Sequence, residues 1–345
     1  MKKYGIILGS VLLPGLLYSG CSNSSESAAA IQQIFGVASE APVFLNCKAL
    51  SSKEIIFEFS LPVQVRSVHF EPPLNVDSIV EGMMVQVDLK QELPVGERFT
   101  TDILVEDARH NTLNVLVPFR ARNDRLPSFI ITELRTEYSK PRAEFVEIKT
   151  LSAGNLGALR LFIASNGLET PVFEFPPVEV RAGEYIVVHL RSLEEGLVNE
   201  TGSNLGISKG TDASDARDFW VPDSKKWLRK TDAVFFMDQD DKILDAVVLS
   251  ENQDSWGTKQ GVVKAVELLA KQGAWLPVSR NSSSINPEDA VSSKATTPTR
   301  SICRDERVSD SNRAANWYIT VGSGASPGKP NNPKRYVPKP SALRL

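Results

Sequence analysis

The stretch Ser128–Leu151, SFIITELRTEYSKPRAEFVEIKTL, contains two strand-like runs on either side of a polar loop. The first run, Phe129–Leu134, is rich in apolar and β-branched residues, and the second, Glu144–Ile148, alternates polar and apolar residues. Pro141 interrupts the loop between them. This pattern predicts a β-hairpin, and the chain after it continues in the same manner.

The alternation in the second run decides which side chains share a face of the strand. Phe145 and Glu147 are expected on one face, and Val146 and Ile148 on the other. Glu144 and Glu147 therefore point to opposite faces and cannot flank one bond as a catalytic pair does. The chain also lacks the G-x-S-x-G and H-E-x-x-H motifs, so the sequence predicts no enzyme activity.

The composition is that of a folded protein. A chain of 345 residues is long enough for two domains, each with its own core. A hydrophobic content of 41% with 23% charged residues is typical of neither a disordered nor a membrane-spanning protein. The net charge of −3 is too close to neutral to indicate a nucleic-acid partner.

The first residues have the pattern of a secretion signal. Lys2 and Lys3 are basic, Tyr4–Leu17 is almost wholly apolar, and small residues precede Cys21. The apolar run is short for a bilayer span. We therefore expect residues 1–20 to be a signal peptide rather than a transmembrane helix.

The residues Leu16–Cys21 resemble the lipobox of bacterial lipoproteins, although Tyr18 stands where an aliphatic residue is usual. The resemblance implies that Cys21 carries a lipid such as palmitate and holds the protein to a membrane of the cell envelope. It leaves open which membrane and leaflet this is. The Ser- and Ala-rich residues 21–41 would form a flexible tether. The alternative is ordinary cleavage nearby, which would release a soluble secreted protein.

With Cys21 lipidated, Cys47 and Cys303 remain. A disulfide would need their Cα atoms within about 7 Å, and they lie in different predicted domains, so we expect two unpaired thiols. The chain has no C-x-x-C pair and its three histidines are scattered, which gives no reason to expect a metal or another cofactor.

Residues 42–123 contain short alternating runs separated by breaks with Pro and Gly, as in Ile55–Phe59 and Val85–Leu89. This spacing predicts a β-sandwich. Four motifs, Phe57–Ser60, Pro62-Val63, Leu93–Gly96 and Asp107–Leu113, resemble those of bacterial Ig-like domains. That resemblance implies a spacer or binding fold without chemistry of its own.

Residues 126–331 contain a series of strand and closing motifs: Ile131–Leu134, Glu144–Ile148, Val178–Val188, Asp232–Asp238, Lys242–Val247, Ser301–Arg304, Asn316-Trp317 and Ser326–Asn331. In this order they resemble a lamin-tail domain, an Ig-like sandwich that also occurs in exported bacterial proteins. The resemblance implies protein or polymer contacts through loops. The family usually has a tryptophan after Leu156-Gly157, where this chain has Ala158-Leu159, so another aromatic such as Phe162 must fill the core there.

Two insertions enlarge this second domain. Residues 193–230 are rich in Gly, Ser and Asp and are predicted to form a long loop. Residues 251–297 contain Val262, Val266 and Leu269 at helical spacing, with Gly273 as a stop. We expect one amphipathic helix that packs on the sheet rather than on a membrane.

Aromatic residues in the first insertion are candidates for partner binding. Phe219, Trp220 and Trp227 lie within it, and tryptophan is enriched at binding hot spots. The alternative is that these residues cap the enlarged core.

Three further segments are expected to be structural. Asp238-Gln239-Asp240-Asp241 lies where a hairpin needs its turn and lacks EF-hand spacing. The glycine-rich run Gly322–Gly328 is followed by Pro330, which prevents the helix that a phosphate-binding loop needs. The basic tail 332–345, with its three prolines, is expected to be extended and mobile.

Together these observations predict an all-β protein with two Ig-like β-sandwich domains in tandem, the second with a long loop insertion and one inserted helix. The expected role is non-catalytic binding or scaffolding at the cell envelope, with a protein or envelope polymer as partner. One alternative is an accessory module of an envelope hydrolase complex. Another is a weak metal-dependent enzyme that uses Asp238, Asp240 and Asp241.

Overall fold

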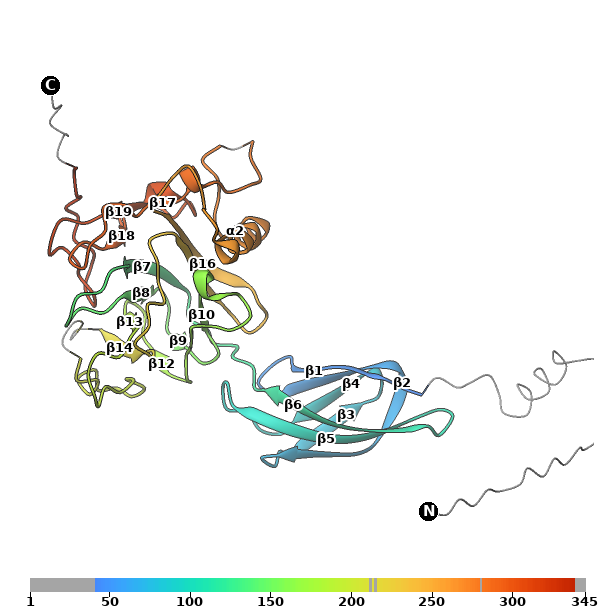
Figure 1. The fold of residues 1–345 in the computed structure, drawn as a ribbon. Helices are drawn as coiled ribbons and strands as arrows, with labels where there is room; N and C mark the ends of the chain where they lie inside the picture. Colours follow the sequence, from blue (N-terminus) through green and yellow to red (C-terminus); the bar gives the residue numbers. More distant parts are fainter. Residues whose placement is uncertain (1–40, 211–212, 214–215, 280, 339–345) are drawn as a thin grey trace, which may run out of the picture.

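The computed structural model describes residues 41–338, apart from 211–212, 214–215 and 280. Figure 1 shows two β-rich bodies joined by the segment that follows β6. The predicted signal peptide, the lipidation residue Cys21 and the predicted tether up to residue 40 lie outside the described residues. Within the described part of the chain, no helix is long and apolar enough to cross a membrane.

The first domain is one antiparallel sheet that folds over on itself. Its strand order is β3-β4-β2-β5-β6, and β1 also pairs with β2. The first half of β2 pairs with β1 and β4, and its second half pairs with β5, so this 18-residue strand passes from one layer to the other. The strands are β1 (Phe44–Ala49), β2 (Glu54–Glu71), β3 (Val76–Val80), β4 (Gly82–Leu89), β5 (Arg98–Asp107) and β6 (Thr112–Arg120).

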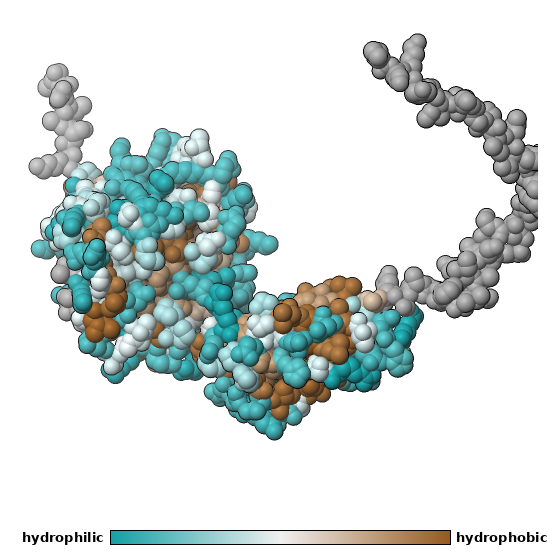
Figure 2. All heavy atoms as spheres, turned by 60° about the horizontal axis from the view of Figure 1, so that its bottom comes forward, coloured by the Kyte–Doolittle hydropathy of each residue, from teal (hydrophilic) through white to brown (hydrophobic). Residues whose placement is uncertain are grey.

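The core of the first domain confirms the predicted faces. Ile55, Phe57 and Phe59 of β2 are buried together with Val85 and Val87 of β4. Figure 2 shows that apolar side chains also gather on the outer surface of this domain. Its large exposed apolar residues are Val43, Leu45, Val80, Met83, Met84 and Leu116.

The second domain has two larger sheets, ordered β14-β13-β8-β7-β18-β19 and β11-β10-β15-β16-β17, and a small pair β12-β9. Their facing side chains form one continuous core. The elements are β7 (Phe129–Arg135), β8 (Phe145–Thr150), β9 (Gly154–Asn155), β10 (Arg160–Ile163), η1 (Ala164–Asn166), β11 (Phe173–Glu174), β12 (Glu179–Val180), β13 (Tyr185–His189), β14 (Arg217–Trp220), β15 (Asp232–Met237), β16 (Ile243–Ser250), α2 (Gln260–Gln272), η2 (Pro287–Asp289), β17 (Val291–Ser292), β18 (Ile302–Arg304), η3 (Ala314–Asn316) and β19 (Trp317–Ile319).

The hairpin predicted from Ser128–Leu151 is confirmed, since β7 pairs with β8 in antiparallel register. Val146 and Ile148 face the core between the sheets, and Phe145 packs on the other face against Val187. Phe162 is buried in the core of the second domain, as expected, and its ring stacks on Phe235 with centroids 5.4 Å apart. The all-β fold class with one helix among the described residues is therefore confirmed.

The two insertions have different outcomes. The long loop predicted for residues 193–230 is wrong at Arg217–Trp220, because this segment forms β14 and extends the sheet in parallel with β13. The predicted helix is confirmed as α2, with Val262 and Leu269 buried against the sheet. Gly273 ends the helix in the left-handed conformation with φ 67°, which glycine adopts without strain.

The prediction of a mobile tail is wrong for its first residues. The Tyr336 N–H donates to the Ile319 carbonyl at 2.8 Å. Arg335 forms an ion pair with Asp305 at 2.8 Å. Residues 332–336 therefore pack on the second domain, and residues 339–345 lie outside the described part of the chain.

Candidate functional site

The aromatic residues proposed for partner binding occupy different environments. Phe219 is fully buried and Trp220 is only 8% exposed, because both residues lie in strand β14 of the sheet. The Trp220 ring stacks on His189 with centroids 3.9 Å apart. For Phe219 and Trp220, the alternative that they cap the enlarged core is the one observed. Trp227 is half-buried, with the Lys225 ammonium 3.5 Å above its ring.

The carboxylates proposed for an alternative metal site already have partners. Asp238 accepts the N–H groups of Asp240 at 2.9 Å and of Lys242 at 3.0 Å, which confirms the predicted hairpin turn. The Asp240 carboxylate pairs with Arg122, and the Asp241 carboxylate pairs with Arg160. Across the described residues, no group of three His, Cys, Asp or Glu side chains is placed to hold a metal ion.

A buried histidine has the partners of a structural residue. His189 Nε2 lies 2.9 Å from Asp218 Oδ1, and Ser208 Oγ donates to the other oxygen of Asp218 at 2.8 Å. Ser208 thus bonds the carboxylate rather than the imidazole, and His189 and Asp218 are almost completely buried. The arrangement lacks the serine-to-histidine contact of a nucleophilic triad. His189 is therefore a structural residue at the end of β13.

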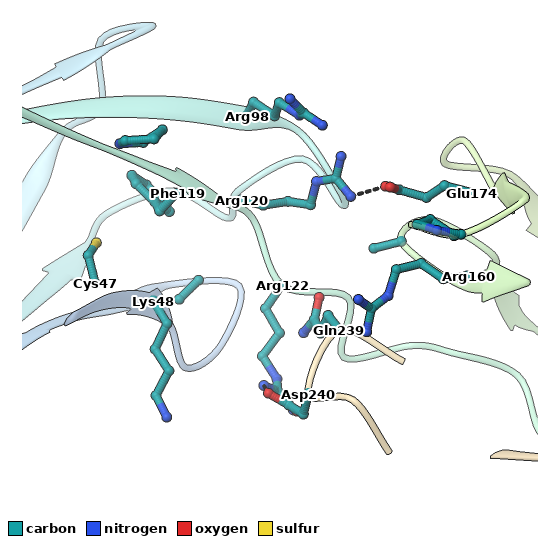
Figure 3. Close-up of a pocket in the computed structure, with 14 residues that line it drawn as sticks. Cys47, Lys48, Arg98, Phe119, Arg120, Arg122, Arg160, Glu174, Gln239 and Asp240 are labelled. Carbon is teal, nitrogen blue, oxygen red and sulfur yellow. Dashed lines mark hydrogen bonds and ion pairs between the residues drawn. The ribbon is translucent and has the colours of Figure 1, made fainter. Parts of the chain in front are cut away.

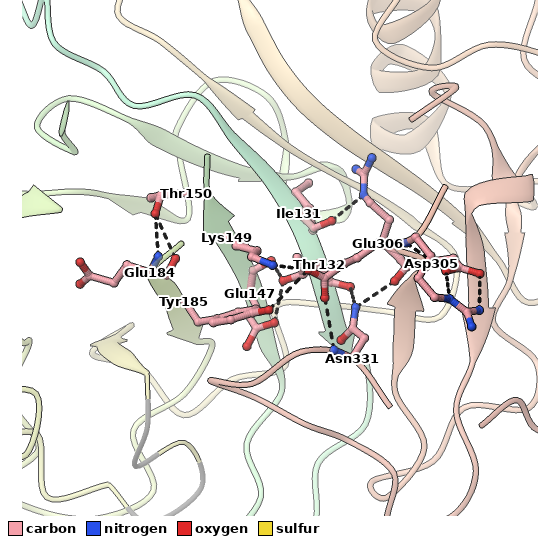
Figure 4. Close-up of polar contacts among 12 residues, drawn as sticks. Ile131, Thr132, Glu147, Lys149, Thr150, Glu184, Tyr185, Asp305, Glu306 and Asn331 are labelled. Carbon is pink, nitrogen blue, oxygen red and sulfur yellow. Dashed lines mark hydrogen bonds and ion pairs between the residues drawn. The ribbon is translucent and has the colours of Figure 1, made fainter. Parts of the chain in front are cut away.

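Two carboxylates of the second domain, those of Glu133 and Glu147, are buried, and Figure 4 shows Glu147 among its polar neighbours. Glu133 of β7 stands opposite Glu147 of β8, and both are fully buried. Burial raises the pKa of both carboxyls, and the charge of Glu133 raises the pKa of Glu147 further. Thr132 Oγ1 donates to Glu147 at 2.6 Å.

The glycine-rich run near the C-terminus binds these carboxylates. The N–H of Ser326 donates to Glu133 Oε2 at 3.0 Å, and the N–H of Gly328 donates to Glu147 Oε2 at 2.6 Å. Asn331 Nδ2 donates to the Thr132 carbonyl at 2.8 Å. The glycine-rich run is therefore structural, as predicted. Glu133 and Glu147 hold it in place by accepting its backbone N–H groups and do not face a substrate.

Asn123 forms the joint between the two domains. Its side-chain Nδ2 donates to the carbonyls of Asn155 at 2.7 Å and Gly157 at 2.8 Å, and its N–H donates to Gln239 Oε1 at 3.1 Å. Asn123 is only 4% exposed. The N–H of Asn155 also donates to the Arg125 carbonyl at 2.7 Å. The link between the domains is thus bonded along its length to the second domain.

A second contact braces this joint. Gly96 of the first domain has φ 72° and lies against Pro177 and Ala158 of the second. Gly157, next to Ala158, is also closely packed. A Cβ added to Gly157 would lie 2.8 Å from Val95 Cγ1, so only glycine allows this approach of the two domains. Because the link and this loop contact the second domain at separate points, they hold the domains at one angle.

An interdomain cleft of about 530 Å³ opens beside the joint, and Figure 3 shows its lining. The first domain contributes the end of β1 and the paired ends of β5 and β6. The second domain contributes β10, β11 and the turn between β15 and β16. In Figure 3, Arg120 extends from the first domain to Glu174 of the second, and Arg122 extends to Asp240.

The cleft carries an excess of positive charge. Its lining holds two carboxylates, those of Glu174 and Asp240, against five cationic side chains, a formal excess of three positive charges. Burial, together with the charges of Arg98 and Arg160, lowers the pKa of Arg120 below its usual value. The five cationic residues are Lys48, Arg98, Arg120, Arg122 and Arg160.

Nothing in the whole-chain charge predicts the arginines of this cleft. One local signal exists, since Arg120 and Arg122 are two residues apart at the end of a strand and so share a face. Arg98 and Arg160 have no such signal, because strand register and the angle between the domains bring them there.

Comparison with known proteins identifies a family for the second domain. Residues 127–319 match a protein family described as "protein second domain". An uncharacterized protein of Treponema pallidum (strain Nichols) is 26% identical over 212 residues, which cover 59% of this chain and 54% of that protein. The chain thus spans about half the length of this relative.

Solved structures give only weak similarities. The N-terminal part of the bacterial S-layer protein SbsC is 14% identical, with 65% of this chain and 47% of that chain covered and a TM-score of 0.25. L,D-transpeptidase 3 from Mycobacterium tuberculosis is 9% identical, with 42% and 81% covered and a TM-score of 0.17. At such TM-scores these similarities carry no argument about function.

Proposed function

The chain belongs to the second-domain family, and from this premise we propose that it is a lipid-anchored cell-envelope protein with a non-catalytic binding role. Its ligand is taken into the interdomain cleft. The observation that carries the proposal is the joint at Asn123, which donates hydrogen bonds to Asn155 and Gly157. These bonds hold the charged ends of the two domains on either side of the cleft. A preformed cleft binds without first losing the entropy of ordering its walls.

The lipid anchor is supported by the sequence alone. Cys21 follows small residues in a lipobox-like context, and residues 21–41 form the tether of this proposal. A flexible chain of that length has a root-mean-square span of roughly 25 Å. The tether would therefore let the cleft stand clear of the membrane surface.

The resemblance of the second domain to lamin-tail domains supports binding through loops. The turn that contains Gln239 and Asp240 lines the cleft, as does the segment around Pro171. Gln272 of α2 braces this turn, with its Nε2 donating to the Asp241 carbonyl at 3.0 Å. The sandwich and its inserted helix thus give the binding loops a rigid support.

Photo-crosslinking on intact cells tests this function. A photoreactive amino acid at position 48, which is exposed on the cleft, should give a discrete adduct. The same amino acid at position 140, exposed in the hairpin between β7 and β8, is the matched control and should give none. Adducts at both positions, or at neither, would contradict a binding role for the cleft.

The anchor is tested separately by fractionation. The Cys21→Ala variant should leave the membrane fraction, because it lacks the thiol to which lipid is attached. Retention of this variant in the membrane fraction would refute lipid anchoring. Protease treatment of intact cells then shows on which side of the envelope the wild-type protein lies.

A further inference from the structure

The register of β5 and β6 places two arginines of the interdomain cleft side by side. Arg98 on β5 stands directly opposite Arg120 on β6. Like charges at opposed positions of an antiparallel pair destabilise a sheet. Arg120 has Glu174 as a partner, whereas Arg98 has no ion-pair partner among the residues that the structure describes. The sheet therefore keeps a repulsion at the cleft that its own side chains leave uncompensated.

The second domain gives Arg120 the partner Glu174, but it also brings a further cation to the cleft. Arg160 on β10 lies close enough for its charge to act on Arg120. Its side chain is only 21% exposed and pairs with Asp241, while its Nε has no hydrogen-bond partner within the described chain. Lys48, exposed at the edge of the same cleft, also lacks an ion-pair partner there. Two cations without an ion-pair partner in the described chain, Arg98 and Lys48, thus share the cleft with Arg160 of the second domain, whose charge is paired with Asp241.

We propose that this cleft binds the phosphate group of a small soluble phosphate ester, with Arg98 and Arg120 as its principal ligands and Arg160 and Lys48 at its sides. This inference rests on the proposed function, because it assigns a ligand class to the same cleft.

The charge of the cleft favours phosphate over a carboxylate. A phosphate monoester carries a charge of about −1.5 to −2 near neutral pH and offers three acceptor oxygens. That charge compensates about half to two thirds of the formal excess on the cleft, whereas one carboxylate compensates only a third of it. Guanidinium groups also match phosphate oxygens with paired N–H donors.

The shape of the cleft favours a small molecule. A volume of about 530 Å³ lies within the range of small-molecule sites. Two of its arginines are recessed, with the side chains of Arg120 and Arg122 less than a third exposed, whereas Arg98 is exposed. Pro118, Phe119 and Pro171 add apolar wall for the organic part of the ester.

Calorimetric titration of the full-length protein in detergent tests the proposal. Inorganic phosphate and glycerol phosphate should bind, whereas acetate, which has a single carboxylate, should bind at least roughly tenfold more weakly at equal ionic strength. The Arg98→Gln variant should lose roughly tenfold or more in phosphate affinity, because a charged hydrogen-bond donor is removed. Its thermal midpoint should not fall, since the change relieves the repulsion with Arg120, and this shows that the variant is folded.

Arg109→Gln is the matched control. Arg109 is exposed in the hairpin at the far end of β5 and β6, and its loss changes the net charge by the same amount. It should leave phosphate affinity unchanged. An equal loss in both variants would reveal general electrostatic attraction and overturn the proposed site, as would unchanged affinity in Arg98→Gln.

Other outcomes would overturn the ligand class. Acetate binding as tight as phosphate binding would assign the cleft to carboxylates. Binding to vesicles with phosphatidic acid that soluble glycerol phosphate does not compete away would assign it to a lipid surface. An adduct at position 48 in cells without phosphate binding by the purified protein would refute the phosphate ester but not the proposed function. Phosphate binding without that adduct would refute the proposed function instead.

Discussion

Glu133 and Glu147 stand opposite each other on β7 and β8, fully buried, and the closing loop of the second domain donates a backbone N–H to each. Two carboxylates so placed do not both ionise readily, because burial and mutual repulsion favour the protonated form. The end of the chain is thus fastened to a pair of groups whose charge depends on pH.

The stability of the second domain should fall as pH rises above the usual pKa of glutamate. In the unfolded chain both carboxyls ionise near that value, whereas in the folded domain burial raises both pKa values. Within this window the folded state binds more protons, so the free energy of unfolding decreases with pH. Urea unfolding of wild type and Glu147→Gln at about pH 5 to 8 measures the effect, and the variant should show the shallower decline.

Glu195→Gln is the control for this measurement, since Glu195 is exposed. It should retain the wild-type dependence on pH. A decline of equal slope in Glu147→Gln and wild type would show that the buried pair is not the cause.

Loss of the Asn123 side chain should loosen the joint. The Asn123→Ala variant leaves the carbonyls of Asn155 and Gly157 without their donor, at a cost of about 1–3 kcal/mol. Trypsin should then cut faster after Arg122 or Arg125, which flank the buried link. Asn204→Ala, in an exposed loop, should be cut at the wild-type rate. Unchanged cleavage of Asn123→Ala would mean that the loop at Gly96 holds the joint by itself.

Alanine in place of Gly261 in helix α2 should destabilise the protein, although alanine has a higher helix propensity than glycine. Replacing a helical glycine by alanine ordinarily stabilises by about 1 kcal/mol. A Cβ at Gly261 would instead lie 2.2 Å from the Ala164 carbonyl oxygen of η1. Gly261→Ala should therefore lower the free energy of unfolding by roughly 1–3 kcal/mol. Gln260→Ala, at the exposed preceding position, should be neutral or slightly stabilising, and a stabilised Gly261→Ala would contradict this close packing.

The two described cysteines are unpaired, as expected, and should resist alkylation in the folded protein. Burial raises the pKa of the Cys47 thiol to about 12 and raises that of Cys303 well above its usual value. The reactive thiolate is therefore scarce near pH 8. In a Cys21→Ala background, iodoacetamide should label both at least roughly a hundredfold more slowly than an added cysteine at exposed Leu45. Cys47 is half-buried, and its labelling at the rate of the Leu45→Cys thiol would contradict its raised pKa.

Local periodicity in the sequence determined the elements of this protein. The alternation in Glu144–Ile148 was enough to predict β8 and the burial of Val146 and Ile148, because strand faces follow from a period of two. The spacing of Val262, Val266 and Leu269 predicted α2, and Gly273 predicted its end. Each of these signals lies within a few residues of the structure it specifies.

Only the tertiary structure decided which residues from distant parts of the chain lie next to each other. Phe219 and Trp220 lie in a segment with loop composition, and pairing with β13 makes it a buried strand. Arg98 and Arg160 are unremarkable in sequence, and they meet because the register of β5 with β6 and the joint at Asn123 place them at one cleft. Register and domain angle depend on contacts between residues far apart in the chain, so a local sequence pattern does not predict them.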